Sequence, residues 1–330
     1  MEDLKFTIIT PSFNQGDFIE ATICSVLKQN YKNVEYFVID GGSTDRSVDV
    51  IEKYQHEIIF WITEKDRGQS HALNKGIRRA TGDILIWINS DDIMEEGALE
   101  SAAKYFLANP SVDVIHGRTI LFQESAHLIR GADEKYLPEH YLSGMAFPQP
   151  SAFIRRSAIE KYHPQLDEAL HYGMDYDLFA CLYLNCFFLS VSNIFSKYRL
   201  HPESKTVNTN EGFAKDWQKV FYNIIHSIGG FEEIKHDLAY LGMEESVELK
   251  YPVSKSFEKT FVLKSFQYFL EFQINFYYRD LNLLMVRRIS AFLKNRFPSF
   301  YKEKNIERLH LISRIPYARY LIPLMRKSAF

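Results

Sequence analysis

Hydrophobic residues in the first 115 positions form short runs, and between these runs they recur at helical spacing. Runs rich in β-branched and aromatic residues predict strands, and the longer stretches between them predict crossover helices. The predicted strands are 6–10, 34–39, 58–62, 84–88 and 112–115, and the predicted helices are 16–29, 45–54 and 71–80. The pattern predicts an α/β fold of Rossmann-like type, with a mostly parallel central sheet flanked by helices. Asn14, Ser43 or Thr44, and Ser70 are the expected N-caps of the three helices.

The pattern changes twice along the rest of the chain. Short strands are predicted at 118–123, 126–130, 151–154, 187–191 and 194–199, which favours a mixed continuation of the sheet. From about residue 206 onward the spacing is helical, and the segments are rich in Phe, Tyr, Leu, Lys and Arg. We therefore predict a first domain over 1–205 and a helical C-terminal region over 206–330.

Composition narrows the class of protein. The chain has 330 residues, of which 46% are hydrophobic, enough for a packed core. Cys24, Cys181 and Cys186 lie in apolar segments without a CxxC pair, which favours a reducing compartment over a disulfide framework or a zinc site. No apolar run approaches the ~20 residues that span a bilayer, and the acidic N-terminus is unlike a secretory signal. We expect a cytoplasmic protein, with peripheral attachment to the inner face of the cell membrane as a further option.

Four polar clusters follow the first four predicted strands. They are Pro11 to Asn14, Asp40 to Asp45, Glu64 to Gly68, and Asn89 to Asp92. In an open parallel sheet the ligand crevice lies beyond the carboxyl ends of the strands, so all four clusters are expected to line one rim.

The adjacent carboxylates of Asp91 and Asp92 need a positive partner, because burying a charge without one costs several kcal/mol. Mg²⁺ or Mn²⁺ would meet this need, since both prefer oxygen ligands from carboxylates, water and phosphates. Alternatively, the two aspartates cap the helix that follows them. The three neighbouring polar loops favour the metal.

The loop Asp40 to Asp45 contains two glycines that let the backbone turn tightly near a ligand. It matches neither a dinucleotide fingerprint nor a P-loop, and a turn with an Asp cap is the simpler alternative. Arg67 could be a solvated loop charge, but a guanidinium on this rim also suits a diphosphate.

Together these segments resemble the inverting family-2 glycosyltransferases with the GT-A fold, of the bacterial polysaccharide-assembly type. The resemblance rests on Thr10 to Gln15, Asp40 to Asp45, the run from Glu64 to Asp83, and Asn89 to Asp92, and it covers about the first 205 residues. Four motifs in the expected order are a more specific signal than the DxD-like element, Asn89 to Asp92, would be alone. Asn89 stands where the family usually has Asp, which leaves the identity of the metal-contacting side chain in question.

The resemblance implies a set of roles. Asp92 is the preferred direct metal ligand, with Asp91 beside it and His201 completing the shell, although a lone loop histidine is more often a polar surface residue. The residues expected to bind the nucleotide sugar are Pro11, Ser12, Asn14, Asp40, Gly42, Arg67, Asn74, Asn89 and Asp91.

On the acceptor side, the resemblance implies a general base at the start of a helix and a sugar contact. Asp175 is the candidate base, and an ordinary first-turn acid on a helix over 176–184 is the alternative. Gln149 is the candidate acceptor contact.

The C-terminal region has its own charge and pattern. Residues 1–249 hold 23 Lys and Arg against 37 Asp and Glu, whereas residues 250–330 hold 16 against 5. Apolar residues from Phe257 to Phe292 recur at helical spacing among basic ones, and a second mixed cluster covers 315–327. This region could bind an anionic membrane surface or pack on protein, including a second copy in a homo-oligomer. No nucleic-acid-binding motif is visible, so we expect no nucleic-acid partner.

The sequence thus predicts a metal-dependent inverting glycosyltransferase. It would move a sugar from a nucleotide-diphosphate sugar to a glycan or lipid-linked acceptor, and a UDP-sugar is the expected donor. A nucleotidyltransferase of the same broad fold is one alternative, although its Gly-rich basic first loop is missing between Thr10 and Gly16. A non-catalytic subunit that binds nucleotide or sugar is the other, and it would tolerate loss of Asp92 and Asp175.

Overall fold

The computed structural model describes residues 4–123, 126–131, 137–205, 212–245, 247 and 250–314. The chain divides into two compact units. Unit 1 comprises Met1–Leu137 and Met145–Val207, and unit 2 comprises Pro138–Gly144 and Asn208–Phe330.

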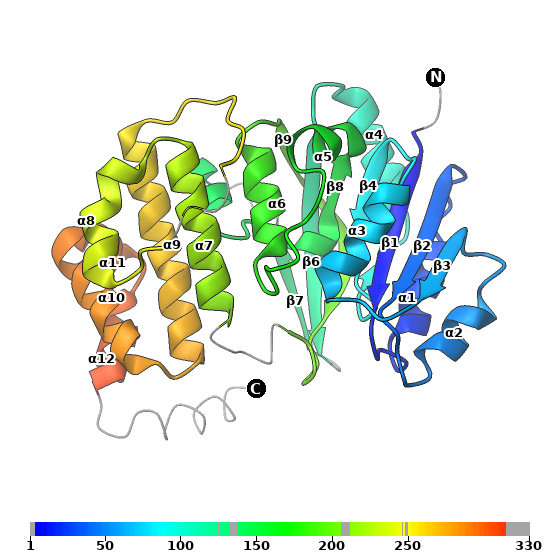
Figure 1. The fold of residues 1–330 in the computed structure, drawn as a ribbon, viewed down its shortest axis with the longest axis horizontal. Coiled ribbons are helices and arrows are strands. Elements are labelled where there is room, and N and C mark those ends of the chain that lie inside the picture. The colour runs from blue at the N-terminus through cyan, green and yellow to red at the C-terminus, as the bar shows by residue number, and fades with distance from the viewer. Residues whose placement is uncertain are drawn as a thin grey trace. The chain divides into compact units, whose positions relative to one another are not determined.

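A nine-stranded mixed sheet organises unit 1 (Figure 1). The strands are β1 (Phe6–Ser12), β2 (Val34–Asp40), β3 (Phe60–Thr63), β4 (Ile84–Trp87), β5 (Ile93–Met94), β6 (Val114–Gln123), β7 (Ala126–Gly131), β8 (Ala152–Arg155) and β9 (Phe188–Arg199). Their order is β3-β2-β1-β4-β8-β6-β9-β5, and β7 pairs with β6. β1 to β4 run parallel, while β8 pairs antiparallel with both β4 and β6. The predicted α/β class and the mostly parallel first half are therefore confirmed.

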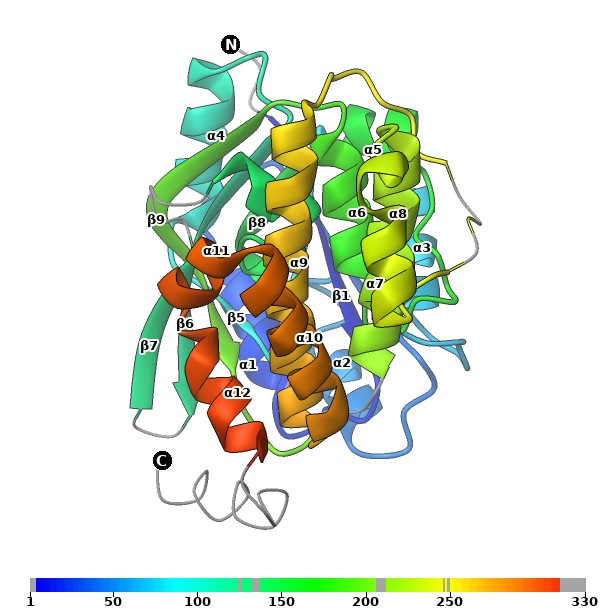
Figure 2. The same ribbon diagram turned by 90° about the vertical axis from the view of Figure 1, so that its left-hand side faces the viewer.

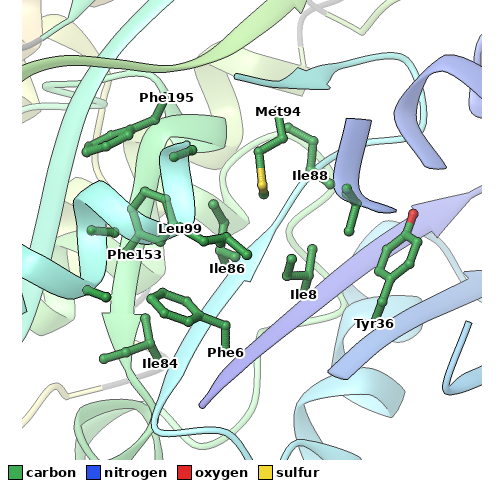
Figure 3. Close-up of a cluster of buried hydrophobic side chains, with 14 of the residues drawn as sticks. Phe6, Ile8, Tyr36, Ile84, Ile86, Ile88, Met94, Leu99, Phe153 and Phe195 are labelled. Carbon is green, nitrogen blue, oxygen red and sulfur yellow. The ribbon is translucent and has the colours of Figure 1, made fainter. Parts of the chain in front are cut away.

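The helices of unit 1 are α1 (Ile19–Leu27), α2 (Ser47–Lys53), α3 (Gln69–Arg79), α4 (Ala98–Ala108), α5 (Arg156–Tyr162) and α6 (Met174–Tyr183), with a 3₁₀ turn η2 (Gln149–Ser151). Side chains alternate between the two faces of a strand, so β1 sends Phe6 and Ile8 to one face and Ile9 to the other. Figure 3 shows Phe6 and Ile8 packed with Ile86 of β4 and Leu99 of α4 in a buried cluster. Both faces of β1 are buried, which explains its continuous apolar run.

The opposite face of β1 is covered by α3. A Cβ added to Gly76 would lie 2.8 Å from Ile9 Cδ1, so the helix approaches the strand too closely for any larger residue. This close approach fixes the start of α3 near the carboxyl end of the sheet, where the polar loops lie.

The predicted helix caps were wrong. Phe18, Arg46 and Gly68 occupy the N-cap positions, and none of their side chains makes a capping hydrogen bond. Asn14 and Ser43 instead connect two loops, because Asn14 N donates to Ser43 Oγ at 2.8 Å. Polar residues that could cap a helix are here used to hold neighbouring loops together.

Unit 2 is helical. Its elements are the 3₁₀ turn η1 (Pro138–Leu142) and the helices α7 (Gly212–Ser227), α8 (Phe231–Leu241), α9 (Lys259–Arg279), α10 (Leu283–Arg296), α11 (Pro298–Glu303) and α12 (Ile306–Arg314). Figure 2 shows α9 to α12 together. The short segment 138–144 is fixed to α9 by Ser143, whose Oγ donates to Ser265 O at 2.9 Å.

Most apolar residues that the sequence places between 257 and 292 lie in the core of unit 2. Phe266, Phe269 and Leu270 of α9 and Ile289 of α10 are at most 1% exposed, so packing accounts for them. Among the described residues, no helix combines the length and apolar character required to cross a bilayer. The second cluster, over 315–327, lies outside the described residues.

Candidate active site

The loops after β1 and β2 meet at one edge of the sheet in unit 1. Ser12 pairs with Asp40 in the register of these strands, and Asp40 pairs with Thr63 of β3. The Asp40 carboxylate is fully buried and accepts hydrogen bonds from Ser43 N at 2.8 Å and from Thr63 Oγ1 at 2.7 Å. Gly42 adopts φ +82°, a left-handed conformation that favours glycine, and its N–H also donates to Asp40. Asp40 therefore shapes the loop that follows β2.

The first loop carries polar atoms without protein partners. Ser12 Oγ and Gln15 Oε1 are buried and have no hydrogen-bond partner among the described residues. Asn14, at φ +51°, accepts a hydrogen bond from Thr44 N at 2.9 Å. Pro11 is buried within β1. Because unpaired buried polar atoms cost free energy, this loop is suited to a ligand that supplies the missing partners.

The acidic loop lies at the end of β4, next to β1. Asp92 is fully buried, and its carboxylate accepts from Arg199 N and from Asn89 Nδ2, each at 3.1 Å. Asp91 has a side chain that is 19% exposed, and its Oδ2 lies 2.9 Å from Nε2 of His201. Pairing of β5 with β9 brings the segment 199–201 to this loop.

Helix capping does not explain the acidic pair. The next helix, α4, begins at Ala98 with Gly97 at its N-cap, and β5 lies between it and the aspartates. Burial raises the pKa of Asp92 well above its usual range, and the nearby charge of Asp91 raises it further. A cation beside the pair would relieve this repulsion.

Asp91 and His201 fit a divalent cation as partial ligands. The described residues contain no group of three or more His, Cys, Asp or Glu side chains that could hold a metal ion. One carboxylate and one imidazole would leave the remaining positions for water and substrate phosphates, as is common for Mg²⁺ and Mn²⁺. Asp92 is less suited to direct ligation, because both of its carboxylate oxygens accept hydrogen bonds within the protein.

A chain of hydrogen bonds connects the acidic loop to Lys205. Asn89 Oδ1 accepts from Gln69 Nε2 at 2.8 Å, and Gln69 Oε1 accepts from Lys205 Nζ at 3.0 Å. Gln69 and Lys205 were not singled out from the sequence. The position of Gln69 at the start of α3, directly after the third polar loop, was the signal that could have found it.

Asp175 lies in the first turn of α6 and is partly buried. Its Oδ1 accepts from Tyr176 N at 2.9 Å. Burial raises the pKa of Asp175, and the positive charge of Lys205 acts in the opposite direction. Ser70 Oγ lies 2.9 Å from Met174 Sδ, so the start of α6 contacts the start of α3. Asp175 and the acidic loop are thus both linked to the Gln69–Lys205 region.

Three other predicted residues make framework contacts. The guanidinium of Arg67 pairs with Glu168, with 2.9 Å between Nε and Oε2. Asn74 is buried and bonds Leu166 through both its amide oxygen and its amide nitrogen. Gln149 is 8% exposed and donates to the carbonyl oxygen of Trp87 at 2.9 Å. Binding roles for these three residues stay predictions, and the structure gives each a stabilising contact.

Known proteins resemble this chain in sequence and in fold. Residues 7–162 match the model of Glycosyl transferase family 2. These residues form a family 2 glycosyltransferase domain. An uncharacterized glycosyltransferase of Rickettsia typhi is 26% identical over 67% of this chain and 72% of its own length. Other relatives near 30% identity match only 34–37% of this chain and 18–50% of their own length.

Solved structures share the fold of this glycosyltransferase. The crystal structure of Staphylococcus aureus TarS 1-349 in complex with UDP has a TM-score of 0.58 and 16% identity, covering 96% of this chain and 92% of TarS 1-349. Mannosyltransferase PcManGT from Pyrobaculum calidifontis, in complex with GDP-Man and Mn²⁺, has a TM-score of 0.54 and 15% identity, covering 100% of this chain and 81% of its own. The GT-A fold predicted from the sequence is confirmed.

Proposed function

We propose that this glycosyltransferase moves a sugar from a nucleoside-diphosphate sugar to an acceptor hydroxyl, with inversion at the anomeric carbon. Two observations support the proposal. The Asp40 and Asp91 loops follow β2 and β4, which both pair in parallel with β1. Lys205, which is connected to the Asp91 loop through Gln69, also lowers the pKa of Asp175. A UDP-sugar is the first donor to consider, because TarS is described in complex with UDP. A glycan or a lipid-linked glycan is the proposed acceptor, and the second would place the reaction at the cytoplasmic face of a membrane.

In the proposed reaction the carboxylate of Asp175 takes the proton of the acceptor hydroxyl. The acceptor oxygen then forms a bond to the anomeric carbon while the bond from that carbon to the β-phosphate oxygen breaks. The nucleoside diphosphate leaves with the bonding electron pair. The partly buried position of Asp175 supports this role, because burial makes its carboxylate a stronger base than a solvated aspartate.

Asp91 and His201 are the proposed protein ligands of Mg²⁺ or Mn²⁺. When bound, the cation would offset negative charge on the diphosphate of the donor. Asp92 supports the site by fixing Arg199 and Asn89 around it. This assignment replaces Asp92 with Asp91 as the preferred direct ligand.

The loops after β1 and β2 are proposed to hold the nucleoside. The unpaired hydroxyl of Ser12 and the amide oxygen of Gln15 offer a donor and an acceptor to a base or a ribose. Asp40 fixes this loop by accepting hydrogen bonds from the backbone N–H groups of Gly42 and Ser43 and from the Ser43 hydroxyl, and it accepts a fourth from Thr63 of β3.

A donor screen tests the proposal. The full chain is incubated with UDP-sugars, GDP-sugars or a nucleoside triphosphate plus sugar 1-phosphate, each with and without Mn²⁺. Release of nucleoside diphosphate from one nucleotide sugar supports the proposal. Pyrophosphate release would instead indicate a nucleotidyltransferase, and tight binding without turnover on any acceptor would indicate a binding subunit.

A further inference from the structure

Unit 2 exposes one apolar side chain on α10 and one on α12. Leu284 is 73% exposed, more than any other large hydrophobic side chain among the described residues, and Leu311 is 60% exposed. Both helices bury their other faces in the core of unit 2, where Val286, Ile289 and Ile306 are at most 2% exposed. The two leucines are therefore not needed for the packing of this core.

α12 packs against α10 (Figure 2). A hollow of about 360 Å³ is lined by residues of both helices, including Leu284 and Arg314. Leu311 lies three positions before Arg314 and therefore on the same side of α12. Apolar and basic residues line the hollow, and the lining contains neither Asp nor Glu. They include Leu284, Met285, Ala291, Arg287, Arg288 and Arg314. The described stretch 283–314 holds 8 Lys and Arg against 2 Asp and Glu, so the positive charge extends beyond the hollow.

Two of the arginines are held in place by backbone carbonyl groups. Arg287 Nε donates to the carbonyl oxygen of Ser313 at 2.7 Å, and the guanidinium of Arg288 donates to the carbonyl oxygen of Tyr240. A guanidinium has five N–H groups, so a single backbone contact leaves others for phosphate oxygens. Tyr240 is itself 60% exposed and lies under the Arg288 guanidinium, which is 5.9 Å from its ring centroid.

We propose that this face, defined by Leu284, Leu311, Arg287, Arg288 and Arg314, binds the surface of an anionic lipid bilayer. Leucine side chains enter the headgroup layer while basic residues contact anionic lipid, which is the combination that interfacial helices use. The absence of acidic residues from the hollow matches the negative charge of such a membrane. This attachment does not rest on the identity of the sugar donor or acceptor.

Co-sedimentation of the full chain with vesicles tests the proposal. We compare two kinds of vesicle. One contains phosphatidylcholine with about 30 mol% phosphatidylglycerol, which gives it the negative surface charge of an anionic membrane. The other contains phosphatidylcholine alone. The variant Leu284→Glu/Leu311→Glu places two negative charges on the face, and its partitioning onto anionic vesicles should fall about tenfold or more. Binding of the wild type should weaken as salt is raised.

A matched control separates the face from a general effect of added charge. Ile59→Glu/Phe187→Glu replaces two residues of unit 1 that are 68% and 65% exposed, and it should bind vesicles like the wild type. Circular dichroism and the melting temperature show whether each variant folds. Equal vesicle binding by both double variants would overturn the proposal, as would equal binding to neutral and anionic vesicles. A change from dimer to monomer without loss of vesicle binding would assign the face to self-association instead.

Discussion

Nε2 of His201 lies 2.9 Å from Oδ2 of Asp91, although 110 positions separate the two residues in the chain. The contact joins the end of β9 to the loop after β4, and β5 is the strand that aligns them. A carboxylate and an imidazole at this distance share a hydrogen bond, and both are groups that bind divalent cations. Burial and the neighbouring charge of Asp91 raise the pKa of Asp92 well above its usual range, and a cation beside the pair would relieve the repulsion between the two carboxyl groups.

The candidate base gives the first prediction. Asp175→Asn should lower kcat by about 10²–10⁴-fold, because general base catalysis contributes on that scale. Affinity for the nucleoside diphosphate and the melting temperature should stay close to those of the wild type, since Asp175 is partly exposed and its carboxylate accepts a hydrogen bond from the adjacent backbone N–H of Tyr176. Steady-state kinetics and a thermal melt measure the two effects.

Asp177 supplies the contrast on the same helix. Its buried carboxylate lies 2.7 Å from Nε2 of His163, so Asp177→Asn should lower the melting temperature. If Asp175→Asn loses stability and nucleotide affinity to the same degree as Asp177→Asn, Asp175 is a structural residue.

Lys205 gives a prediction on pH dependence. Burial raises the pKa of Asp175, and Lys205 opposes that rise. A base acts only when deprotonated, so activity is lost as the pH falls through its pKa. Removing the positive charge in Lys205→Met should raise this pKa, and the acid limb of kcat/KM should move to higher pH.

The matched control is Lys205→Arg, which keeps the charge and should keep the acid limb where the wild type has it. A pH–rate profile of all three proteins makes the comparison. If Lys205→Met lowers the rate equally at every pH and the profile does not move, Lys205 does not affect the pKa of the base and acts instead through its contact with Gln69.

Glu35 gives a prediction on stability. Burial alone would raise its pKa, but Lys5, Thr7 and Thr81 outweigh burial and lower the pKa to about 2. The carboxylate accepts from Thr7 Oγ1 at 2.6 Å and lies 2.7 Å from Lys5 Nζ. Because the folded pKa lies below the ordinary glutamate value of 4.5, the stabilisation is present above pH 4.5 and is lost as the pH falls toward 2.

Glu35→Gln should therefore lower the free energy of unfolding by about 2–3 kcal/mol at pH 7, and the difference from the wild type should shrink below pH 4.5. Urea denaturation at several pH values measures it, with the exposed Glu57→Gln as control. A difference that stays constant down to pH 3 would show that the lost carboxylate charge is not the cause.

The strands near the site could be predicted because their apolar runs are buried on both faces. Phe6 to Ser12 and Ile84 to Trp87 are fully buried, and such runs leave few alternatives to a central strand. The polar loops were placed by the parallel topology, since the carboxyl ends of adjacent strands share one edge. The pairing of Asp91 with His201 depends on β5. This strand has two residues, which is too short for its hydrophobic pattern to predict a strand from the sequence.

The roles of single polar residues were harder to predict. Asn14 and Ser43 have the side chains of helix caps, yet tertiary hydrogen bonds between two loops determine their positions. Gln149 is the candidate acceptor contact in the sequence, and in the structure its side-chain amide donates a hydrogen bond to the carbonyl oxygen of Trp87. In both cases the partner comes from a distant segment, which local spacing does not reveal.

In the proposed site Asp91 and His201 would hold a divalent cation that offsets the negative charge of the donor diphosphate. Isothermal titration of UDP, with and without Mn²⁺, tests it most directly in the wild type, Asp91→Asn, His201→Gln and the exposed control Asp17→Asn. The account predicts that Mn²⁺ tightens UDP binding about tenfold or more in the wild type and the control, and that both site variants lose this gain. An equal gain from Mn²⁺ in all four proteins would contradict it.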